Sequence, residues 1–370
     1  MSNNHRPIGV DAGKLDSNMT VQTTHDDSLR WLSPLEQPFH IAGFAWFALE
    51  RKYRRLPVAS ADAIPPAVDK LADCTTGGQI RFLTYSSRLS IRVKLAAPAN
   101  MYHMPATGQC GFDCYVGEHG NQRYLSTTRF DHTQPEYEAP LFDWNEKREV
   151  HVTLNFPLYQ GVEEVWIGVD PDAKVGAPET YASTGPIVVY GTSITQGGCA
   201  SRPGMAYTNV LSRSLPYEFI NLGFSGNGRG EPEVARIIAS IENPALYVLD
   251  YEANTGTVER MADTLPTFIQ ILRERHPTVP ILVVSKIKFA KEHFFPDDLK
   301  LRLDRLNVQR STVERLQAAG DANVHFLDGG TLLGDSLYEE CTVDGVHPTD
   351  LGFYRMAESL EPVIRSLLEG

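Results

Sequence analysis

Residues 187–195 read IVVYGTSIT, an apolar run that ends at a glycine and then at a threonine and a serine. The run Ile187–Tyr190 predicts a short strand that is buried on both faces. A serine just past the carboxyl end of such a strand lies where an open α/β sheet places its chemistry. The stretch therefore predicts an α/β domain and a candidate nucleophile, Ser193.

From residue 185 onward, short apolar runs alternate with longer amphipathic segments. Strands that alternate with helices indicate βαβ units and a parallel sheet, and right-handed crossovers place helices on both faces of that sheet. We therefore expect a three-layer α/β/α domain of flavodoxin-like type. The predicted strands are 187–190, 218–221, 246–250, 281–285 and 324–327, and the predicted helices are 205–215, 231–241, 258–275, 299–319 and 351–368.

The N-terminal half of the chain has a different period. Residues 88–95 alternate between polar and apolar side chains, which is typical of a strand with one face in water. Turn residues separate several such runs, so this half predicts an all-β sandwich that is jelly-roll-like. The predicted strands are 39–47, 79–85, 89–95, 111–116, 148–154 and 162–169.

The two patterns meet at a stretch rich in aspartate, proline and glycine, residues 170–178, which reads as a linker. At 370 residues the chain is long enough for two domains. We predict a flexible N-terminal tail over residues 1–25, a β-sandwich domain over 26–180 and a catalytic domain over 181–370.

An acid and a histidine lie three residues apart near the C-terminus, in Asp344-Gly345-Val346-His347. At this spacing the carboxylate can hold one imidazole nitrogen and leave the other free to act as a base. The alternative is a helix N-cap beside a surface histidine, because the residues that follow also suit a cap. Together with Ser193, the acid and the histidine complete a candidate catalytic triad.

Two further loops follow predicted strands and carry hydrogen-bond donors. Residues 221–228 read NLGFSGNG, and residues 250–254 read DYEAN. The backbone of a glycine-rich loop and a side-chain amide can both donate to an oxyanion. The first loop lacks the lysine of a phosphate-binding loop and the spacing of a dinucleotide-binding loop, so phosphate binding is not favoured.

These four segments, in this order, resemble the SGNH (GDSL-like) hydrolase superfamily over residues 185 to 370. The resemblance implies that Ser193 is the nucleophile and that Asp344 and His347 complete the triad. It also implies an oxyanion hole made by the Ser193 and Gly226 backbones and the Asn254 amide. Two blocks depart from the pattern, since they read Gly-Thr-Ser-Ile instead of Gly-Asp-Ser-Leu and Glu-Ala-Asn-Thr instead of Gly-x-Asn-Asp. Neither departure removes a reacting group.

A phrase in the N-terminal half also resembles a known signature. Residues 111–116 read GFDCYV, which resembles the GxDLY signature of β-sandwich domains that precede some SGNH hydrolase domains, with Cys114 in the leucine position. Just before it lie Tyr102, His103 and Met104, which we interpret as candidates that reach over the cleft and shape the substrate pocket. The alternative is that this phrase is a strand with a structural aspartate and buried aromatic residues.

Two charged residues near the oxyanion loops are further candidates for substrate binding. Glu252 lies two residues before Asn254. Its alternative role is to hold the loop in place. Arg229 lies in the glycine-rich loop, where its guanidinium could contact an anionic substrate.

Composition indicates a globular protein without identifying its activity. Hydrophobic residues make up 42% of the chain and charged residues 22%, which are ordinary values. The net charge of −12 argues against nucleic acid or an anionic membrane surface as a partner. No apolar run approaches the roughly 18 residues of a membrane helix. The polar start lacks the apolar stretch of a secretory signal, so we expect a cytoplasmic protein. The five cysteines are scattered and read as reduced thiols.

The candidate triad predicts acyl-transfer chemistry. The serine attacks an ester carbonyl while the histidine takes its proton, and water or another alcohol then takes the acyl group. This chemistry needs no metal and no cofactor. We therefore expect a serine esterase for small or short-chain acyl esters, with O-acetylated sugars as the leading substrate class. An acyltransferase or a lactonase with the same triad, and a non-catalytic carbohydrate-binding module, are the alternatives. The oligomeric state is left open.

Overall fold

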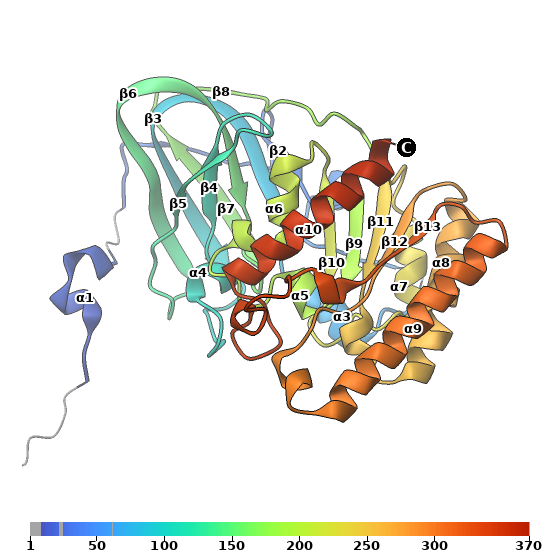
Figure 1. Ribbon diagram of the computed structural model, residues 1–370. Coiled ribbons are helices and arrows are strands. Elements are labelled where there is room, and N and C mark those ends of the chain that lie inside the picture. The colour runs from blue at the N-terminus through green and yellow to red at the C-terminus, as the bar shows by residue number, and fades with distance from the viewer. Residues whose placement is uncertain (1–8, 22–24, 61, 370) are drawn as a thin grey trace, which may run out of the picture.

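A computed structural model describes residues 9–21, 25–60 and 62–369 of the chain. It contains an antiparallel β-domain, at the left of Figure 1, and an α/β domain at the right. The predicted tail, residues 1–25, lies partly outside the described residues. Its described part contains the short α-helix α1 (Ala12–Leu15), which Figure 1 shows away from both domains, and the 3-10 helix η1 (Ser17–Met19).

The N-terminal domain is built on two long strands, β3 (Gln79–Leu95) and β6 (Glu136–Asn155), which pair antiparallel along most of their length. The strand order is β1-β7-β3-β6-β4-β5. Strand β6 pairs with one edge of β3, and β7, β2 and β8 pair with the other edge. The remaining elements are β1 (Arg30–Leu32), β2 (His40–Ala42), α2 (Phe47–Glu50), α3 (Pro66–Leu71), α4 (Ala106–Gln109), β4 (Asp113–Val116), β5 (Arg123–Thr127), β7 (Val162–Val169) and β8 (Lys174–Gly176).

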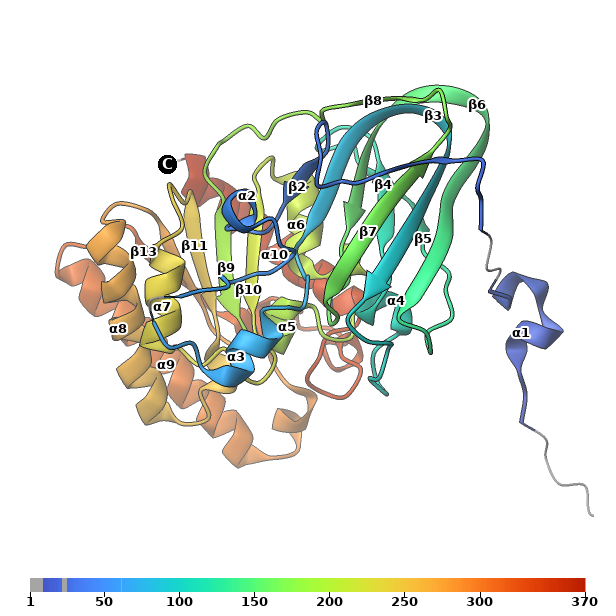
Figure 2. The same cartoon turned by 180° about the vertical axis from the view of Figure 1, so that it is seen from behind.

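This architecture confirms the predicted antiparallel β class, but the strand limits differ. The sequence predicts separate strands at 79–85 and 89–95, whereas β3 is continuous through both. The pairing register with β6 shifts between Ser86 and Arg88, so this polar stretch is a β-bulge that bends the strand instead of ending it. Figure 2 shows β3 and β6 arching together at this end of the domain.

The predicted strand 39–47 is wrong in its second half. Only His40–Ala42 pairs with β3. Gly43 has a φ of +86°, where the chain leaves the strand and turns toward α2. The short strand β5 was not predicted, because its run Arg123–Thr127 contains a single aliphatic residue and gives no period-2 signal.

The C-terminal domain is a five-stranded parallel sheet in the order β10-β9-β11-β12-β13. Helices α6 and α10 lie on one face of the sheet, and α7, α8 and α9 lie on the other (Figures 1 and 2). The elements are β9 (Ile187–Gly191), α5 (Ser193–Gln196), α6 (Tyr207–Ser214), β10 (Phe219–Gly223), α7 (Pro232–Ala239), β11 (Leu246–Asp250), α8 (Val258–Arg275), β12 (Ile281–Val284), α9 (Pro296–Ala318), β13 (Val324–Leu327) and α10 (Asp350–Glu369). The predicted three-layer α/β/α class is therefore confirmed.

Strand β9 shows why its sequence is apolar throughout. Val188 and Tyr190 belong to the hydrophobic cluster under α7 and α8, whereas Ile187 and Val189 belong to the cluster under α6 and α10. Successive side chains of a strand point to opposite faces, and helices cover both faces of this sheet. Every residue of the run is therefore buried.

Strand order also decides which loops meet. β9 pairs with β10 on one side and with β11 on the other, and all three strands are parallel. Their carboxyl ends therefore lie at one edge of the sheet, at the point where the strand order reverses. Ligands of open α/β sheets bind at such a point. The three loops that carry Ser193, Gly226 and Asn254 begin there.

The β-domain contributes residues to both cores of the α/β domain. Leu56, Val68 and Ala72 belong to the cluster on the α7 and α8 face. Met104 and Leu158 belong to the cluster on the α6 and α10 face. The two domains thus pack against each other through shared hydrophobic cores.

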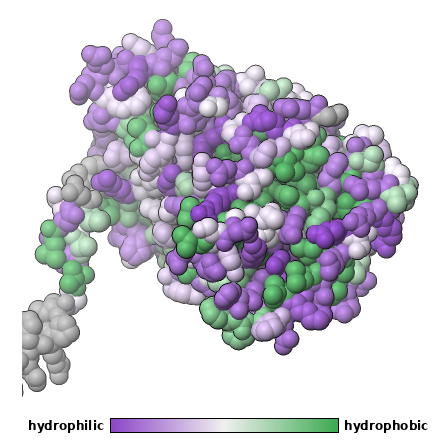
Figure 3. Space-filling view, viewed as in Figure 1, coloured by the Kyte–Doolittle hydropathy of each residue, from purple (hydrophilic) through white to green (hydrophobic). Residues whose placement is uncertain are grey.

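The face of the molecule seen in Figure 3 is mixed in character. Hydrophilic residues cover much of it, and hydrophobic patches interrupt them over the α/β domain. Within the described residues, no helix combines the length and the apolar composition that crossing a membrane requires.

Candidate active site

Ser193 is the first residue of α5, directly after β9. Thr192 caps the helix, because its side chain accepts from the backbone N–H of Ile194 and Thr195 bonds back to the Thr192 backbone. A side chain at Gly191 would collide with Thr195 and with the carbonyl of Asp250. The glycine and the capping box together turn the chain sharply and present the serine at the end of the strand.

His347 connects Ser193 to Asp344. Its Nε2 lies 2.9 Å from Ser193 Oγ, and its Nδ1 lies 2.8 Å from Asp344 Oδ2. The other carboxylate oxygen, Oδ1, accepts the backbone N–H groups of Val346 (3.0 Å) and His347 (2.8 Å). Gly345 has a φ of +83° in the turn between the acid and the histidine. The predicted Asp344-x-x-His347 pair is therefore a compact turn that faces the serine.

The carboxylate of Asp344 is held in its charged form. Partial burial acts to raise its pKa, but hydrogen bonds from the His347 backbone and ring outweigh this effect and lower the pKa below its ordinary value. A charged carboxylate fixes the proton of the ring on Nδ1 and leaves Nε2 as the acceptor for the serine hydroxyl.

The glycine-rich loop after β10 is fixed by hydrogen bonds and leaves free space at Gly226. Gly226 has a φ of +67°, and there is free space where a side chain would stand. Arg229 Nε donates to the Gly226 carbonyl (2.8 Å), and the Ser225 backbone N–H donates to Gln196 Oε1 (2.9 Å). The exposed Arg229, a candidate for substrate binding, therefore fixes the orientation of this loop.

Asn254 ends the short 3-10 turn η3 (Glu252–Asn254), which follows β11. Its Nδ2 donates to the Phe224 carbonyl across the glycine-rich loop, at 3.3 Å. A side-chain amide has two hydrogens, so a second one is available to a ligand. This bond links the two loops that were predicted to form the oxyanion hole.

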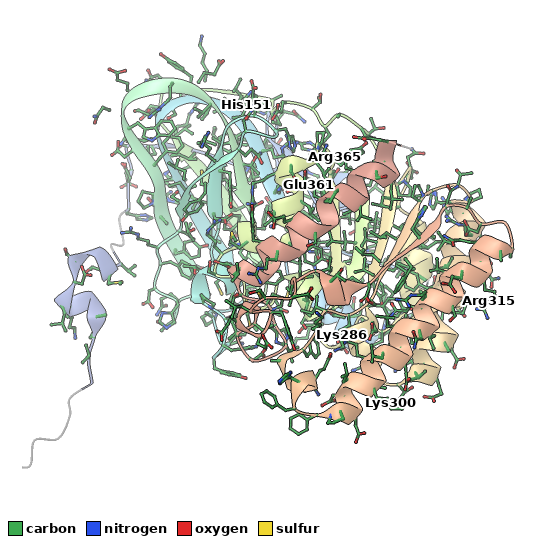
Figure 4. All side chains as sticks on the ribbon, viewed as in Figure 1. His151, Lys286, Lys300, Arg315, Glu361 and Arg365 are labelled. Carbon is green, nitrogen blue, oxygen red and sulfur yellow. The ribbon has the colours of Figure 1, made fainter. Side chains whose placement is uncertain are left out.

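Glu252 is 1% exposed, so it offers almost no surface to a substrate. Its carboxylate accepts the Lys286 backbone N–H (2.7 Å) and the Gln309 amide (2.8 Å), and it pairs with Arg305 at 3.3 Å. Lys286, labelled in Figure 4, lies at the same edge of the sheet as α5. The structure thus places Glu252 as the anchor of the Asn254 loop, which was the alternative role for this residue.

The loop before α4 brings the β-domain to the triad. The rings of His103 and His347 meet edge to face, with centroids 5.6 Å apart, and Tyr102 stacks on His103 at 4.5 Å. The side chain of Tyr102 is 94% exposed. Met104, in contrast, is 4% exposed and packs in the core cluster with Ile194. It therefore anchors the loop in the core and does not reach over the site as predicted.

Two residues at this site have no signal in the sequence. Tyr159, on the segment that follows β6, donates its hydroxyl to the Ser193 carbonyl at 3.2 Å. Gln196 is fully buried and donates to the Leu158 carbonyl while it accepts from Ser225. Because both contacts join segments that are far apart in the chain, no local motif reveals them.

The arrangement defines a class of protein, a three-layer α/β/α domain with a Ser-His-Asp constellation whose serine follows β9. Residues 184–365 match the family model of GDSL-like lipases and acylhydrolases. Residues 29–175 match that of the N-terminal GxDLY domain of SGNH-hydrolase-type esterases. Comparison with curated proteins gives no significant match.

Solved structures show the same two-domain arrangement. A protein from Bacteroides ovatus described as a GDSL-like lipase is 32% identical, with a TM-score of 0.84, over 92% of this chain and 98% of that one. A salicylyl-acyltransferase from a tetracycline biosynthetic pathway has a TM-score of 0.71 at 21% identity, over 93% and 98%. A family two carbohydrate esterase from Cellvibrio japonicus has a TM-score of 0.59 at 14% identity, over 92% and 98%. The chain therefore belongs to the GDSL-like lipase/acylhydrolase family, and it is an SGNH-type hydrolase with a GxDLY-type N-terminal domain.

Proposed function

We propose that the protein is a serine esterase in which Ser193 is the nucleophile, His347 the general base and Asp344 the group that orients the base. The observation that carries this proposal is the pair of hydrogen bonds from His347, 2.9 Å to Ser193 Oγ and 2.8 Å to Asp344 Oδ2. A serine hydroxyl is a weak nucleophile unless a base of this kind removes its proton.

The reaction proceeds in two halves. Ser193 Oγ bonds to the ester carbonyl carbon while His347 Nε2 takes the hydroxyl proton. The tetrahedral intermediate then breaks its bond to the alcohol oxygen, which receives the proton from the imidazolium. Water repeats the sequence on the acyl-enzyme, so the acid is released and Ser193 Oγ regains its proton. Asp344 remains a carboxylate throughout and stabilises the imidazolium.

The negative charge that develops on the carbonyl oxygen requires donors that are already in place. We assign this role to the backbone N–H groups of Ser193 and Gly226 and to the free hydrogen of the Asn254 amide. The hydrogen bonds that hold the loops, Arg229 to Gly226 and Asn254 to Phe224, support the assignment, since they orient the donors before substrate arrives.

We propose hydrolysis as the main fate of the acyl group. The side chains of His347 and Asp344 are 22% and 29% exposed, which gives water access to the triad. We propose a small or short-chain acyl group, with an O-acetylated sugar as the substrate class. A fold relative described as a carbohydrate esterase, which covers 92% of this chain, supports this class.

The test is turnover of p-nitrophenyl acetate by the wild type and by Ser193→Ala. The variant should lose nearly all turnover and keep its folded circular dichroism spectrum, because a half-buried hydroxyl contributes little to the core. A fluorophosphonate should label the wild type on Ser193. Ser311→Ala, which removes an exposed serine hydroxyl on α9, is the control and should keep both activity and labelling. Labelling elsewhere, or full activity of Ser193→Ala, would refute the proposal.

A second experiment separates the two fates of the acyl group. Acetylated mono- and oligosaccharides are supplied with and without an excess of a free sugar or alcohol acceptor. If the protein is a hydrolase, the amount of acetate released should be the same with and without the acceptor. Transfer of most of the acetyl groups to the acceptor would make the protein an acyltransferase instead.

A further inference from the structure

Three metal-binding side chains gather beside the nucleophile. His103, Cys199 and His347 each offer one ligand atom, and these atoms all lie within 4.8 Å of one another. They come from three separate parts of the chain: the β-domain loop, the turn after α5 and the turn before α10. Two imidazoles and one thiol are a donor set that suits Zn²⁺ and similar thiophilic cations.

His103 has a buried nitrogen without a partner. Its Nδ1 makes no hydrogen bond within the described residues, although it is shielded from solvent. A buried polar atom without a partner is costly and calls for an explanation. Its ring is clamped between Tyr102, which stacks on it, and His347, which meets it edge to face. The ring is thus held at the rim of the triad with one unpartnered nitrogen, and a cation bound by the ring would satisfy it.

Cys199 has an unusual backbone for its residue type. Its φ is +75°, a left-handed conformation that costs a non-glycine residue free energy, and its side chain is 3% exposed. Burial raises the pKa of its thiol to about 12, so the free thiol keeps its proton and is no nucleophile at neutral pH. A metal ion displaces this proton when it binds the sulfur.

We propose that His103, Cys199 and His347 form a binding site for a Zn²⁺-type cation, and that its occupation switches the esterase off. Both ring nitrogens of His347 are engaged in the triad, one with Ser193 and one with Asp344. A cation on either nitrogen therefore breaks one of these two hydrogen bonds. The binding step releases the Cys199 thiol proton to solvent and changes no oxidation state.

The geometry needs only a small adjustment. Zn–S and Zn–N bonds of about 2.3 and 2.0–2.1 Å place tetrahedral donors about 3.3–3.6 Å apart, so the three atoms must close in by about 1 Å. The exposed Tyr102 and the loop around it leave room for His103 to make this shift. Water supplies the fourth ligand, as it does in sites with three protein ligands.

The experiment uses the full chain in a buffer without thiols or chelators. Zn²⁺ is the inhibitor and Co²⁺ is the spectroscopic probe. We expect one equivalent of Zn²⁺ to suppress p-nitrophenyl acetate turnover, and EDTA to restore it. Co²⁺ should produce the near-ultraviolet charge-transfer absorption of a thiolate bound to cobalt, a readout that requires no esterase activity.

Cys199→Gly is the decisive variant, because glycine suits the positive φ and the variant keeps the fold. It should lose the cobalt–thiolate absorption and need at least roughly 10–100-fold more Zn²⁺ for inhibition. Metal sites lose this much affinity when only a hydrogen-bond partner of a ligand is removed, so loss of a ligand should cost no less. Its metal-free turnover should equal that of the wild type. Cys110→Ala, which removes another fully buried thiol in the β-domain core, is the matched control and should keep the metal response.

Three outcomes would overturn the inference: no cobalt–thiolate absorption in the wild type, an unchanged response in Cys199→Gly, or metal binding that leaves turnover intact. His103→Gln should weaken Co²⁺ binding in a direct titration, and an unchanged affinity would also overturn it. Only the inhibition rests on the proposed role of His347. If the wild type shows no ester turnover, or Ser193→Ala keeps full turnover, while the absorption persists, the proposed function fails and the metal site stands.

Discussion

At the scale of single residues, Asp344 shows how one side chain serves two purposes. One carboxylate oxygen accepts two backbone N–H groups and holds the turn, and the other orients the His347 ring. An amide oxygen could still hold the turn, but an amide N–H would face Nδ1 and force the ring into the wrong tautomer. Structure and catalysis can therefore be separated by one substitution.

Asp344→Asn should keep the fold and lower kcat by roughly 10⁴-fold, the loss seen for the same change in serine proteases. In the wild type, turnover should fall as the pH drops, because protonation of His347 removes the base. The lowered pKa of Asp344 keeps its carboxylate charged through this range. The loss of turnover at low pH should therefore come from the histidine and not from the aspartate. A kcat/KM profile with one ionisation is the measurement. A flat profile into the acid range, with acylation rate-limiting, would argue against a histidine base.

Asn254→Ala tests the oxyanion hole. The variant should lower kcat by roughly 10²–10³-fold, the usual cost of one such donor, while KM changes less, because the bond is strongest in the transition state. Asn307→Ala, an exposed asparagine on α9, is the control and should keep wild-type kinetics. If KM rises and kcat stays constant, Asn254 binds substrate instead of the oxyanion.

The sequence was informative for residues whose chemistry depends on local order. The Asp344-x-x-His347 spacing and the strand before Ser193 are local patterns, and the structure brings these three side chains together. Glu252 was ambiguous because its partners Arg305 and Gln309 lie on α9, more than fifty positions later in the chain. Burial of a charge depends on contacts that no local pattern contains.

At the scale of elements, the loop after β11 explains the departure from the family pattern. Where the pattern has glycine, this chain has Glu252, whose carboxylate ties the loop to α9 and to the backbone after β12. Thr255, in the place of the usual aspartate, donates to the Glu252 carbonyl at 2.8 Å. A buried ionic anchor thus stands where the pattern has a glycine, and Asn254 bonds to the Phe224 carbonyl.

Element limits were predictable where the signals are strong. The amphipathic pattern predicted α8 at its observed bounds, 258–275. Helix α9 begins three residues before the predicted start, although Pro296 at the first helical position and two aspartates in the first turn mark it. The split of β3 at residue 86 was wrong because a polar bulge and a turn look alike in sequence.

The loop of Tyr102 and His103 predicts a role in selecting substrate. Tyr102 is exposed and rests on His103, which touches His347, so this loop can contact the acyl or alcohol group. Tyr102→Ala should change the preference among acetyl, butyryl and sugar esters more than the rate on p-nitrophenyl acetate. Tyr85→Ala, a partly exposed tyrosine on β3, is the control. Identical preferences in wild type and Tyr102→Ala would exclude the loop from substrate binding.

At the scale of the whole molecule, the domain limits drawn from sequence stay a prediction, whereas the packing between the domains is plain. Arg55, in the N-terminal half, is fully buried and donates to the carbonyls of Leu71 (2.6 Å), Cys74 (2.7 Å), Asn221 (3.3 Å) and Gly223 (2.5 Å). Its guanidinium also lies 4.7 Å from the centre of the Phe224 ring. One cation therefore joins the N-terminal domain to the end of β10, just before the glycine-rich loop.

Arg55→Met should show that the two domains are stabilised together. Burial lowers the pKa of Arg55 to about 10, so it is still charged at neutral pH, and its planar fork supplies donors that methionine lacks. Each buried carbonyl left without a partner costs about 1–3 kcal/mol, so we expect a loss of at least about 3 kcal/mol in the free energy of unfolding. Because Gly223 leads into the glycine-rich loop, kcat should fall as well.

Urea unfolding followed by circular dichroism, together with turnover measured along the same titration, is the measurement. The wild type should lose structure and activity in one transition, and Arg55→Met should do so at a lower urea concentration. Arg51→Met, which changes a half-exposed arginine on the same segment, should leave the midpoint within experimental error. Two separate transitions, with activity lost only in the second, would mean that the catalytic domain stands without its neighbour. The contacts of Arg55 would then stabilise the β-domain without stabilising the catalytic domain.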